Sequence, residues 1–189
     1  KSALLAGLKK AGVSLSDIKA ALVTHGHVDH FGLARWLQEE GGCQIYGHEE
    51  EQEYIESFPG THLQVIDQFR TVSDENGYPK EEYEETIRDH AQSQHLARAA
   101  RFDISLKDRD IIEFGDVTLQ ALHTPGHTGG SLCYRWEEDL FSGDTILEHI
   151  TPVTFFKGVR RKTGPGHYRR SLETLSNLDV RKAHPGHQR

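Results

Sequence analysis

The chain has 189 residues, a length that fits one domain. Its formal net charge of −7 argues against a protein whose whole surface binds nucleic acid. Two cysteines, Cys43 and Cys133, cannot form the disulfide framework of a small secreted scaffold, so a cytoplasmic protein with buried, inert thiols is expected. No apolar run approaches the roughly 18 residues of a membrane span. The 13 histidines are numerous, and histidine is the commonest metal ligand.

The N-terminal quarter predicts a helix followed by a β-α-β unit. Residues 1–12 are amphipathic and lack the long apolar centre of a signal peptide, so we expect an ordinary helix there. Short apolar runs at 18–23 and 43–46 are typical of buried strands, whereas residues 29–40 have apolar positions at helical spacing.

Residues 49–89 are strongly acidic, with 13 acidic and 3 basic side chains. We expect two or three helices, the last at 81–100, as a helical insertion at about 49–100. The simplest interpretation is an exposed element with solvated charges. If the insertion instead covers a site, its apolar side chains would form a substrate wall: Tyr54, Ile55, Phe58, Phe69 and Tyr83.

The second half of the chain has a β pattern. Residues 111–114 and 117–122 predict a hairpin across a Gly-Asp turn, and 131–136 with 139–141 predict a second strand pair. A final short strand is expected at 180–183.

Six basic side chains lie between residues 157 and 170, among three glycines and a proline. This composition predicts a loop, followed by a helix at 168–178. The loop could bind an anionic part of a substrate, or it could simply balance the charge of the acidic insertion.

The stretch from Thr24 to His30 holds four ligand-type side chains where an apolar strand gives way to a helix. His25 and His27 are two residues apart and point to one side of an extended segment. Asp29 and His30 begin the helix and can face the same cavity. So many ligands in one heptapeptide indicate more than one metal ion.

Three further candidate ligands follow short apolar stretches beside glycine or proline. They are His127 in Thr-Pro-Gly-His-Thr, Asp144 in Ser-Gly-Asp-Thr and His187 in His-Pro-Gly-His. Glycine lets the backbone approach a metal closely, and proline stiffens the loop that aims the imidazole.

These motifs, in this order, resemble the metallo-β-lactamase superfamily and its glyoxalase-II-like (hydroxyacylglutathione hydrolase-like) branch. The resemblance implies two metal sites joined by one bridging carboxylate: His25, His27 and His127 for the first, Asp29, His30 and His187 for the second, and Asp144 as the bridge.

The resemblance implies an αββα sandwich, of class α/β (α+β). Relatives begin with strands ahead of the helix at residue 1 and continue into a helix after the final His. We therefore expect a partial metallo-β-lactamase-like domain over 1–189, with the N-terminal strands missing and the helical insertion at about 49–100.

Two divalent ions would lower the pKa of a shared water and supply hydroxide at neutral pH. Zinc is the expected ion because it suits imidazole and carboxylate ligands, although manganese or iron could occupy such a site. Asp29 and Asp144 are the expected catalytic residues, because their carboxylates can orient the hydroxide or accept its proton. His149, His123 and His184 are candidates for supporting roles near the site.

Among activities in the superfamily, hydrolysis of a thioester or ester is expected first. A lactonase, a nuclease or a mono-iron persulfide dioxygenase remain alternatives. β-Lactam hydrolysis is not implied, because antibiotic-hydrolysing members typically differ at the positions of His30 and Asp144. Flavin-partnered diiron enzymes have Glu where His27 stands.

A hypothesis of another class is a non-catalytic scaffold that uses the acidic helices as an interface. The intact set of ligands argues against it. The expected partner is a small-molecule substrate, with neither a membrane nor nucleic acid involved; the sequence does not indicate the oligomeric state.

Overall fold

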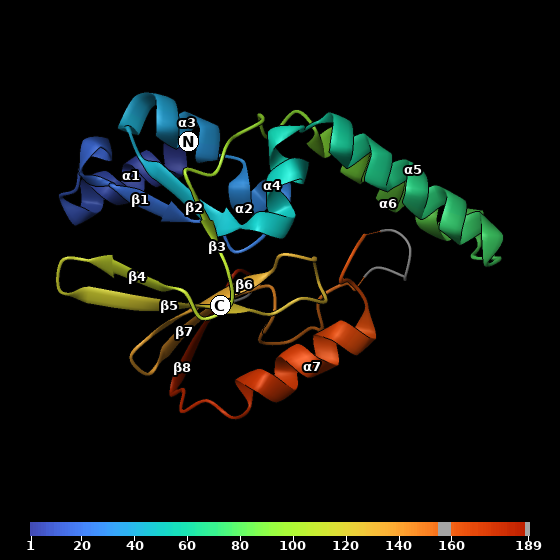
Figure 1. Ribbon diagram of the computed structural model, residues 1–189. Coiled ribbons are helices and arrows are strands. Elements are labelled where there is room, and N and C mark those ends of the chain that lie inside the picture. Colours follow the sequence, from blue (N-terminus) through green and yellow to red (C-terminus); the bar gives the residue numbers. More distant parts are fainter. Residues whose placement is uncertain (155–159, 188–189) are drawn as a thin grey trace.

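The computed structural model describes residues 1–154 and 160–187. Two sheets face each other, with helices on the outer side of each (Figure 1). Helices α1 (Ser2–Ala11), α2 (Val28–Phe31) and α3 (Ala34–Trp36) lie on the side of the first sheet. Helix α7 (Pro165–Leu175) covers the second sheet. The αββα order expected from the sequence is confirmed.

The first sheet contains β1 (Ala20–Leu22), β2 (Gln44–His48) and β3 (Ile104–Leu106), which are all parallel. The predicted β-α-β unit is therefore confirmed. A short 3₁₀ turn, η1 (Leu15–Asp17), precedes β1.

The segment at 29–40 is helical as predicted, but the helix is interrupted rather than continuous. α2 ends at Phe31, α3 follows after Gly32 and Leu33, and a π-helical turn, η2 (Leu37–Gly41), completes the segment. At the break a Cβ on Gly32 would lie 3.3 Å from the carbonyl oxygen of Leu96, so the returning chain packs directly against the backbone.

The second sheet has the order β4-β5-β6-β7-β8. Strands β4 to β7 are antiparallel and β8 joins β7 in parallel, so both predicted hairpins are confirmed. β8 lies about two residues later than the predicted strand. The bounds are β4 (Ile111–Phe114), β5 (Val117–His123), β6 (Leu132–Trp136), β7 (Asp139–Gly143) and β8 (Lys182–Pro185).

Helix α7 begins earlier than predicted, because Pro165 occupies its first turn, where the missing N–H costs nothing. Residues 165–167 therefore belong to the helix, and the prediction that they form part of a loop is wrong. Residues 157–159 of the basic stretch lie outside the described residues.

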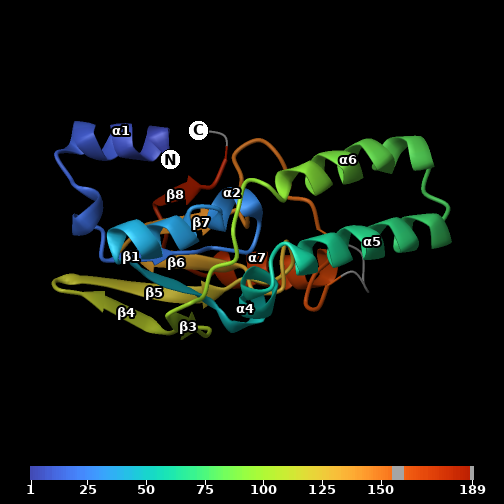
Figure 2. The same ribbon diagram turned by 90° about the horizontal axis from the view of Figure 1, so that it is seen from above.

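The acidic insertion forms three helices, α4 (Glu49–Glu56), α5 (Gly60–Glu75) and α6 (Lys80–Ser93). α5 and α6 run side by side and project from the sandwich as a helical hairpin (Figures 1 and 2). α6 ends before the predicted residue 100, since Ala97 and Ala100 are drawn into the main core. In the described ranges, no helix combines the length and apolarity that crossing a membrane requires.

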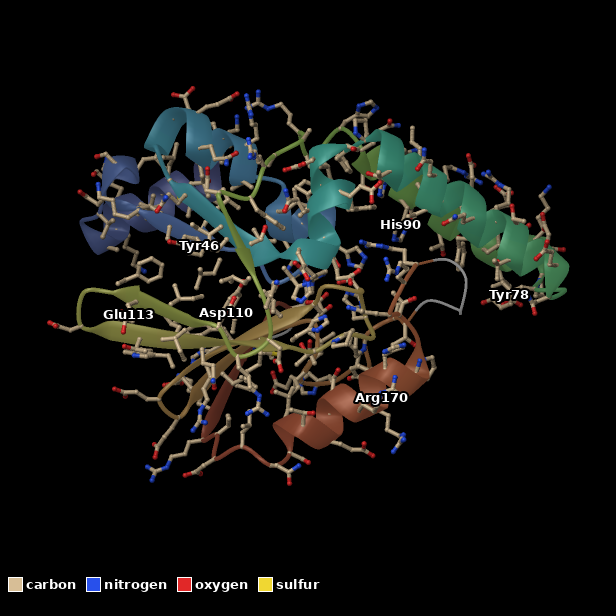
Figure 3. All side chains as sticks on the ribbon, viewed as in Figure 1. Tyr46, Tyr78, His90, Asp110, Glu113 and Arg170 are labelled. Carbon is tan, nitrogen blue, oxygen red and sulfur yellow. The ribbon has the colours of Figure 1, made fainter. Side chains whose placement is uncertain are left out.

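Apolar side chains fill the space between the two sheets. Leu119, Leu132 and Tyr134 of the second sheet pack with Leu22 and Tyr46 of the first. Figure 3 shows Tyr46 on the side of the first sheet that faces the second. The buried hydroxyl of Tyr134 donates a hydrogen bond of 2.8 Å to the carbonyl oxygen of Val23, just after β1. This bond fixes the end of β1 relative to the second sheet, which places the following residues.

Candidate metal centre

All seven predicted ligands lie in segments that follow strand ends. Residues 25–30 follow β1, and the loop after β5 carries His127. Asp144 follows β7, and His187 follows β8. β5, β7 and β8 run in the same direction within their sheet, so their carboxyl ends meet at one edge. The ligands are spread from residue 25 to residue 187 of the sequence, and the fold gathers them at this edge.

The first group contains His25, His27 and His127, whose nearest side-chain nitrogens lie within 4.8 Å of one another. His27 Nδ1 is 3.1 Å from His25 Nε2 and 3.0 Å from His127 Nε2. Ligands about 2.0–2.1 Å from a common zinc ion are separated by roughly 3 Å. The spacing of these nitrogens therefore fits one metal ion.

His127 is held in the tautomer that a metal needs. Its Nδ1 lies 2.6 Å from the carbonyl oxygen of Val153, which can only accept, so Nδ1 carries the proton. The lone pair of Nε2 therefore points toward His27. A backbone carbonyl that fixes the far nitrogen of an imidazole is a common support for a metal ligand.

The second group contains Asp29, His30 and His187. His187 Nε2 is 3.1 Å from both His30 Nε2 and the Oδ2 atom of Asp29. This group is more exposed than the first, because Asp29 and His187 keep about half of their side-chain surface accessible, 52% and 45%. This group therefore offers a second position for a metal ion, at the open side of the site.

Asp144 lies between the two groups. Its Oδ2 is 3.6 Å from His127 Nε2 and 3.5 Å from His187 Nε2, and its Oδ1 is 3.5 Å from His30 Nε2. Among the described residues, Oδ1 is buried without a hydrogen-bond partner. A buried oxygen of this kind is costly unless a cation completes it. The donor set thus fits two metal ions with Asp144 between them.

Gly186 is required for this arrangement. A Cβ at Gly186 would lie 2.5 Å from Asp144 Oδ1 and 2.7 Å from the His30 ring. Only glycine lets the chain before His187 pass so close to the carboxylate.

The pKa values of the central side chains favour the deprotonated forms that bind metals. Burial holds the pKa of His25 and His27 well below the usual range, and their histidine neighbours lower it further. Burial also lowers the pKa of His127. For Asp144 burial raises the pKa, but the nearby imidazoles of His30 and others outweigh it and leave the pKa below its ordinary value.

Glu51 of α4 is a residue that the sequence analysis missed, since it was counted among the solvated acids. Its side chain is 1% exposed. Oε1 accepts a 2.7 Å hydrogen bond from the backbone N–H of Gly130, and Oε2 accepts one of 2.8 Å from Arg160. A Cβ on Gly26, between His25 and His27, would collide with Oε2. Glu51 therefore contacts both loops that carry the first ligand group.

The basic stretch supplies counter-charges to α4. Arg160 pairs with Glu51, and Lys162 Nζ lies 2.6 Å from Glu50 Oε1. For these two side chains, the interpretation that the stretch balances the acidic insertion is supported. Arg169 pairs with Glu173 within α7.

The other histidines that the sequence analysis considered do not contact the ligands. His149 is exposed and lies 3.5 Å from Glu148. His184 Nε2 pairs with Asp139 at 2.7 Å, and His123 Nε2 bonds the carbonyl oxygen of Gly129, in the loop that carries His127. Both cysteines are buried, and burial raises the pKa of Cys133 to about 11, as expected for an inert thiol.

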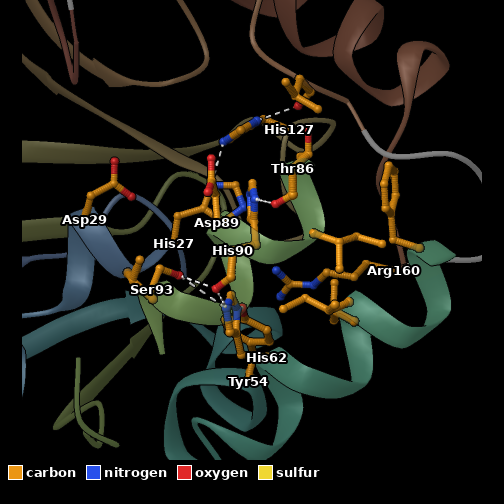
Figure 4. A pocket seen from close by; sticks show the side chains of 16 residues that line it. His27, Asp29, Tyr54, His62, Thr86, Asp89, His90, Ser93, His127 and Arg160 are labelled. Atoms are coloured by element: carbon orange, nitrogen blue, oxygen red, sulfur yellow. Dashed lines mark hydrogen bonds between the residues drawn. The ribbon is translucent and has the colours of Figure 1, made fainter. Parts of the chain in front are cut away.

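A cavity of about 420 Å³ opens beside the ligands, between the sandwich and the α5–α6 hairpin (Figure 4). His27, Asp29 and His127 belong to its lining. Of the wall residues predicted from the insertion, Tyr54 and Phe69 line the cavity, whereas Ile55, Phe58 and Tyr83 are buried in cores behind it. The remaining lining residues are Val28, His62, Val65, Ile66, Thr86, Ile87, Asp89, His90, Ser93, Val153 and Arg160.

We predict that Glu51→Gln weakens zinc binding by about 10- to 100-fold, because residues that orient ligands typically contribute that much. The amide still accepts from Gly130 but leaves the Arg160 charge unpaired, which should also lower the free energy of unfolding by about 3 kcal/mol. Chelator competition and urea unfolding measure the two effects. Glu50→Gln is the matched control, since its partner Lys162 is 39% exposed and such pairs contribute less than about 1 kcal/mol. Equal effects of both variants would contradict the role of Glu51.

The metal-free protein should lose stability as the pH falls below about 6.5. The folded-state pKa values of His25, His27 and His127 are lowered, so the unfolded chain takes up protons that the folded chain does not. The contribution of these histidines to the free energy of unfolding is fully present above their pKa in the unfolded chain. As the pH falls below that value, the free energy of unfolding declines by about 1.4 kcal/mol per pH unit for each proton that only the unfolded chain binds. Urea unfolding of chelator-treated protein at several pH values between about 7.5 and 5 measures this slope, and a flat profile would contradict it.

The sequence is similar to two curated hydrolases over part of their length. It is 29% identical over 132 residues to the probable polyketide biosynthesis zinc-dependent hydrolase PksB of Bacillus subtilis, covering 70% of this chain and 40% of that protein. It is 28% identical over 146 residues to a hydroxyacylglutathione hydrolase of Rhodopseudomonas palustris, covering 76% of this chain and 39% of that protein. The chain thus spans well under half the length of either relative.

The fold is shared with a solved structure along the whole chain. The metallo-beta-lactamase family protein TTHA1429 from Thermus thermophilus matches with a TM-score of 0.76 and 26% identity, covering 100% of this chain and 60% of that one. The sequence profile of the metallo-beta-lactamase superfamily matches residues 1–187, a range that includes all seven ligand-type side chains. The chain therefore belongs to the metallo-beta-lactamase superfamily.

Proposed function

We propose that this chain is the catalytic part of a two-metal hydrolase that cleaves a small thioester or ester. The observation that carries the proposal is the pair of three-residue ligand groups with the Asp144 carboxylate between them. Two divalent ions bound there would polarise the substrate and lower the pKa of a water toward about 7. Zinc is the ion we expect, and the name of the Bacillus subtilis relative supports this choice.

The chain's own residues position the reactants. Asp144 is fixed by burial and by four surrounding imidazoles, so its carboxylate can hold a water in one orientation. Asp29 lies at the open side of the site, within the cavity lining, where its carboxylate can accept a proton. Burial lowers the pKa of His127, which favours the neutral ring, and the carbonyl oxygen of Val153 fixes its tautomer.

The charges near the site favour a small substrate over a nucleic acid. Arg160 and Lys162 are paired with Glu51 and Glu50, so their charges are compensated within the protein. Thioester hydrolysis is preferred to the lactonase alternative because one relative is named a hydroxyacylglutathione hydrolase, and that name indicates a glutathione thioester.

The purified protein should carry close to two transition-metal ions per chain, which elemental analysis measures. At most one ion after zinc supplementation would exclude the two-metal proposal, and a single iron would favour the dioxygenase alternative.

Asp144→Ala should lower thioester turnover at least about tenfold more than His149→Ala does. Asp144 contacts both ligand groups, whereas His149 is exposed and paired with Glu148.

An acyl thioester should be hydrolysed faster than an oligoribonucleotide is cleaved, at both low and moderate salt. The 13 acidic side chains at 49–89 disfavour the approach of a polyanion. Parallel assays of the two substrates give the comparison. Faster RNA cleavage that falls steeply with added salt would replace this proposal with the nuclease alternative.

A further inference from the structure

The cavity beside the ligands has an apolar wall supplied mainly by the α5–α6 hairpin. Val65, Ile66 and Phe69 of α5 and Ile87 of α6 line it. Val28 and Val153 complete this surface from the sandwich: the first lies next to the ligand His27, and the second is the residue whose carbonyl fixes His127. The apolar surface is therefore continuous with the candidate metal centre.

Three polar side chains of the lining, Tyr54, His62 and Arg160, already have partners within the protein. His62 Nε2 donates to the carbonyl oxygen of His90 at 2.8 Å, so His62 Nδ1 must accept, and the Tyr54 hydroxyl donates to it at 2.7 Å. The guanidinium of Arg160 is paired with Glu51 and lies over the Tyr54 ring at 4.3 Å. These groups do not require a polar ligand to satisfy them.

The charge of the lining disfavours an anionic ligand arm. Away from the candidate ligands, Asp89 contributes a carboxylate to the cavity, whereas the positive charge of Arg160 is offset by Glu51 (Figure 4). A carboxylate or phosphate on the arm would meet net negative charge at close range. A neutral hydrocarbon chain meets no such penalty and gains by leaving water.

We propose that this cavity binds a neutral aliphatic arm of the substrate, with the reacting carbonyl at the end lined by His27, Asp29 and His127. The volume of about 420 Å³ lies within the usual range of small-ligand pockets. The inference rests on the proposed function, since the arm belongs to the ester or thioester cleaved there. It names a class of substrate: aliphatic acyl compounds without charge on the arm.

The test measures binding separately from hydrolysis. Straight-chain alkanamides from butanamide to octanamide are titrated into the zinc-loaded protein by isothermal calorimetry. Because each buried methylene adds about fourfold to affinity, the dissociation constant should fall about fourfold per added carbon until the cavity is full. 6-Sulfohexanamide, whose terminal sulfonate is anionic but a poor zinc ligand, should bind at least about tenfold more weakly than hexanamide.

Two substitutions at Val65 locate the arm. Val65→Trp fills the cavity and should weaken octanamide binding at least about tenfold, whereas Gln64→Trp, at an exposed position of the same helix, should leave it unchanged. Val65→Ala enlarges the cavity. In this variant the affinity should keep rising for one or two more carbons of chain length than it does in the unsubstituted protein. If Val65→Trp does not fold, Val65→Ala alone decides.

The outcomes separate the two proposals. Binding that does not depend on chain length, or that is unchanged in the folded Val65 variants, would overturn the arm site even if thioesters are hydrolysed. Chain-length-dependent binding without any ester or thioester hydrolysis would support the cavity as an aliphatic site and contradict the proposed function instead.

Discussion

Nitrogen and oxygen lone pairs face one another at close range at one edge of the two sheets, at His25, His27, His127 and Asp144. Neutral imidazoles that are buried together cannot all donate to each other, and protonating them is opposed by burial. Divalent cations bound there would resolve this conflict, because His25, His27, His127 and Asp144 could all donate lone pairs to them. The strand ends, the Gly186 approach and the Tyr134–Val23 bond all serve to hold these donors in place.

The Glu51–Arg160 pair extends this constraint to the helical insertion. A buried ion pair contributes little net stability compared with apolar packing, but removing one partner is costly. Here the carboxylate contacts both loops that carry the first ligand group, at Gly26 and Gly130. The pair is therefore better understood as fixing the relative positions of two loops. It also offsets the charge of Arg160 in a cavity that the insertion encloses.

Local patterns in the sequence predicted the features that depend on neighbouring residues. The dense His/Asp motif at 25–30, the glycine and proline beside His127 and His187, and the strand periodicities could all be recognised without a structure. Features that depend on contacts between residues distant in the sequence could not be recognised in this way. The packing of Leu96 against Gly32 and the burial of Ala97 in the main core, just after α6, both join residues distant in the sequence. Glu51 had no local signal, since only the fold shows that it is buried.

The helical insertion carries acidic side chains on its exposed surface and apolar side chains in its interior. Most of its acids are exposed, with Glu51 as a buried exception, while Ile66, Tyr83 and Ile87 form a small core of the hairpin, with Phe69 packed against it. This cluster is distinct from those that support the sheets. Of the cavity wall, Ile66, Ile87 and Phe69 belong to this hairpin cluster, whereas Val28 and Val65 pack against the main core. Side chains of the hairpin cluster can therefore change with little effect on the candidate ligands. Under the proposed function, selectivity for the substrate arm would therefore depend in part on a cluster that does not support the candidate ligands.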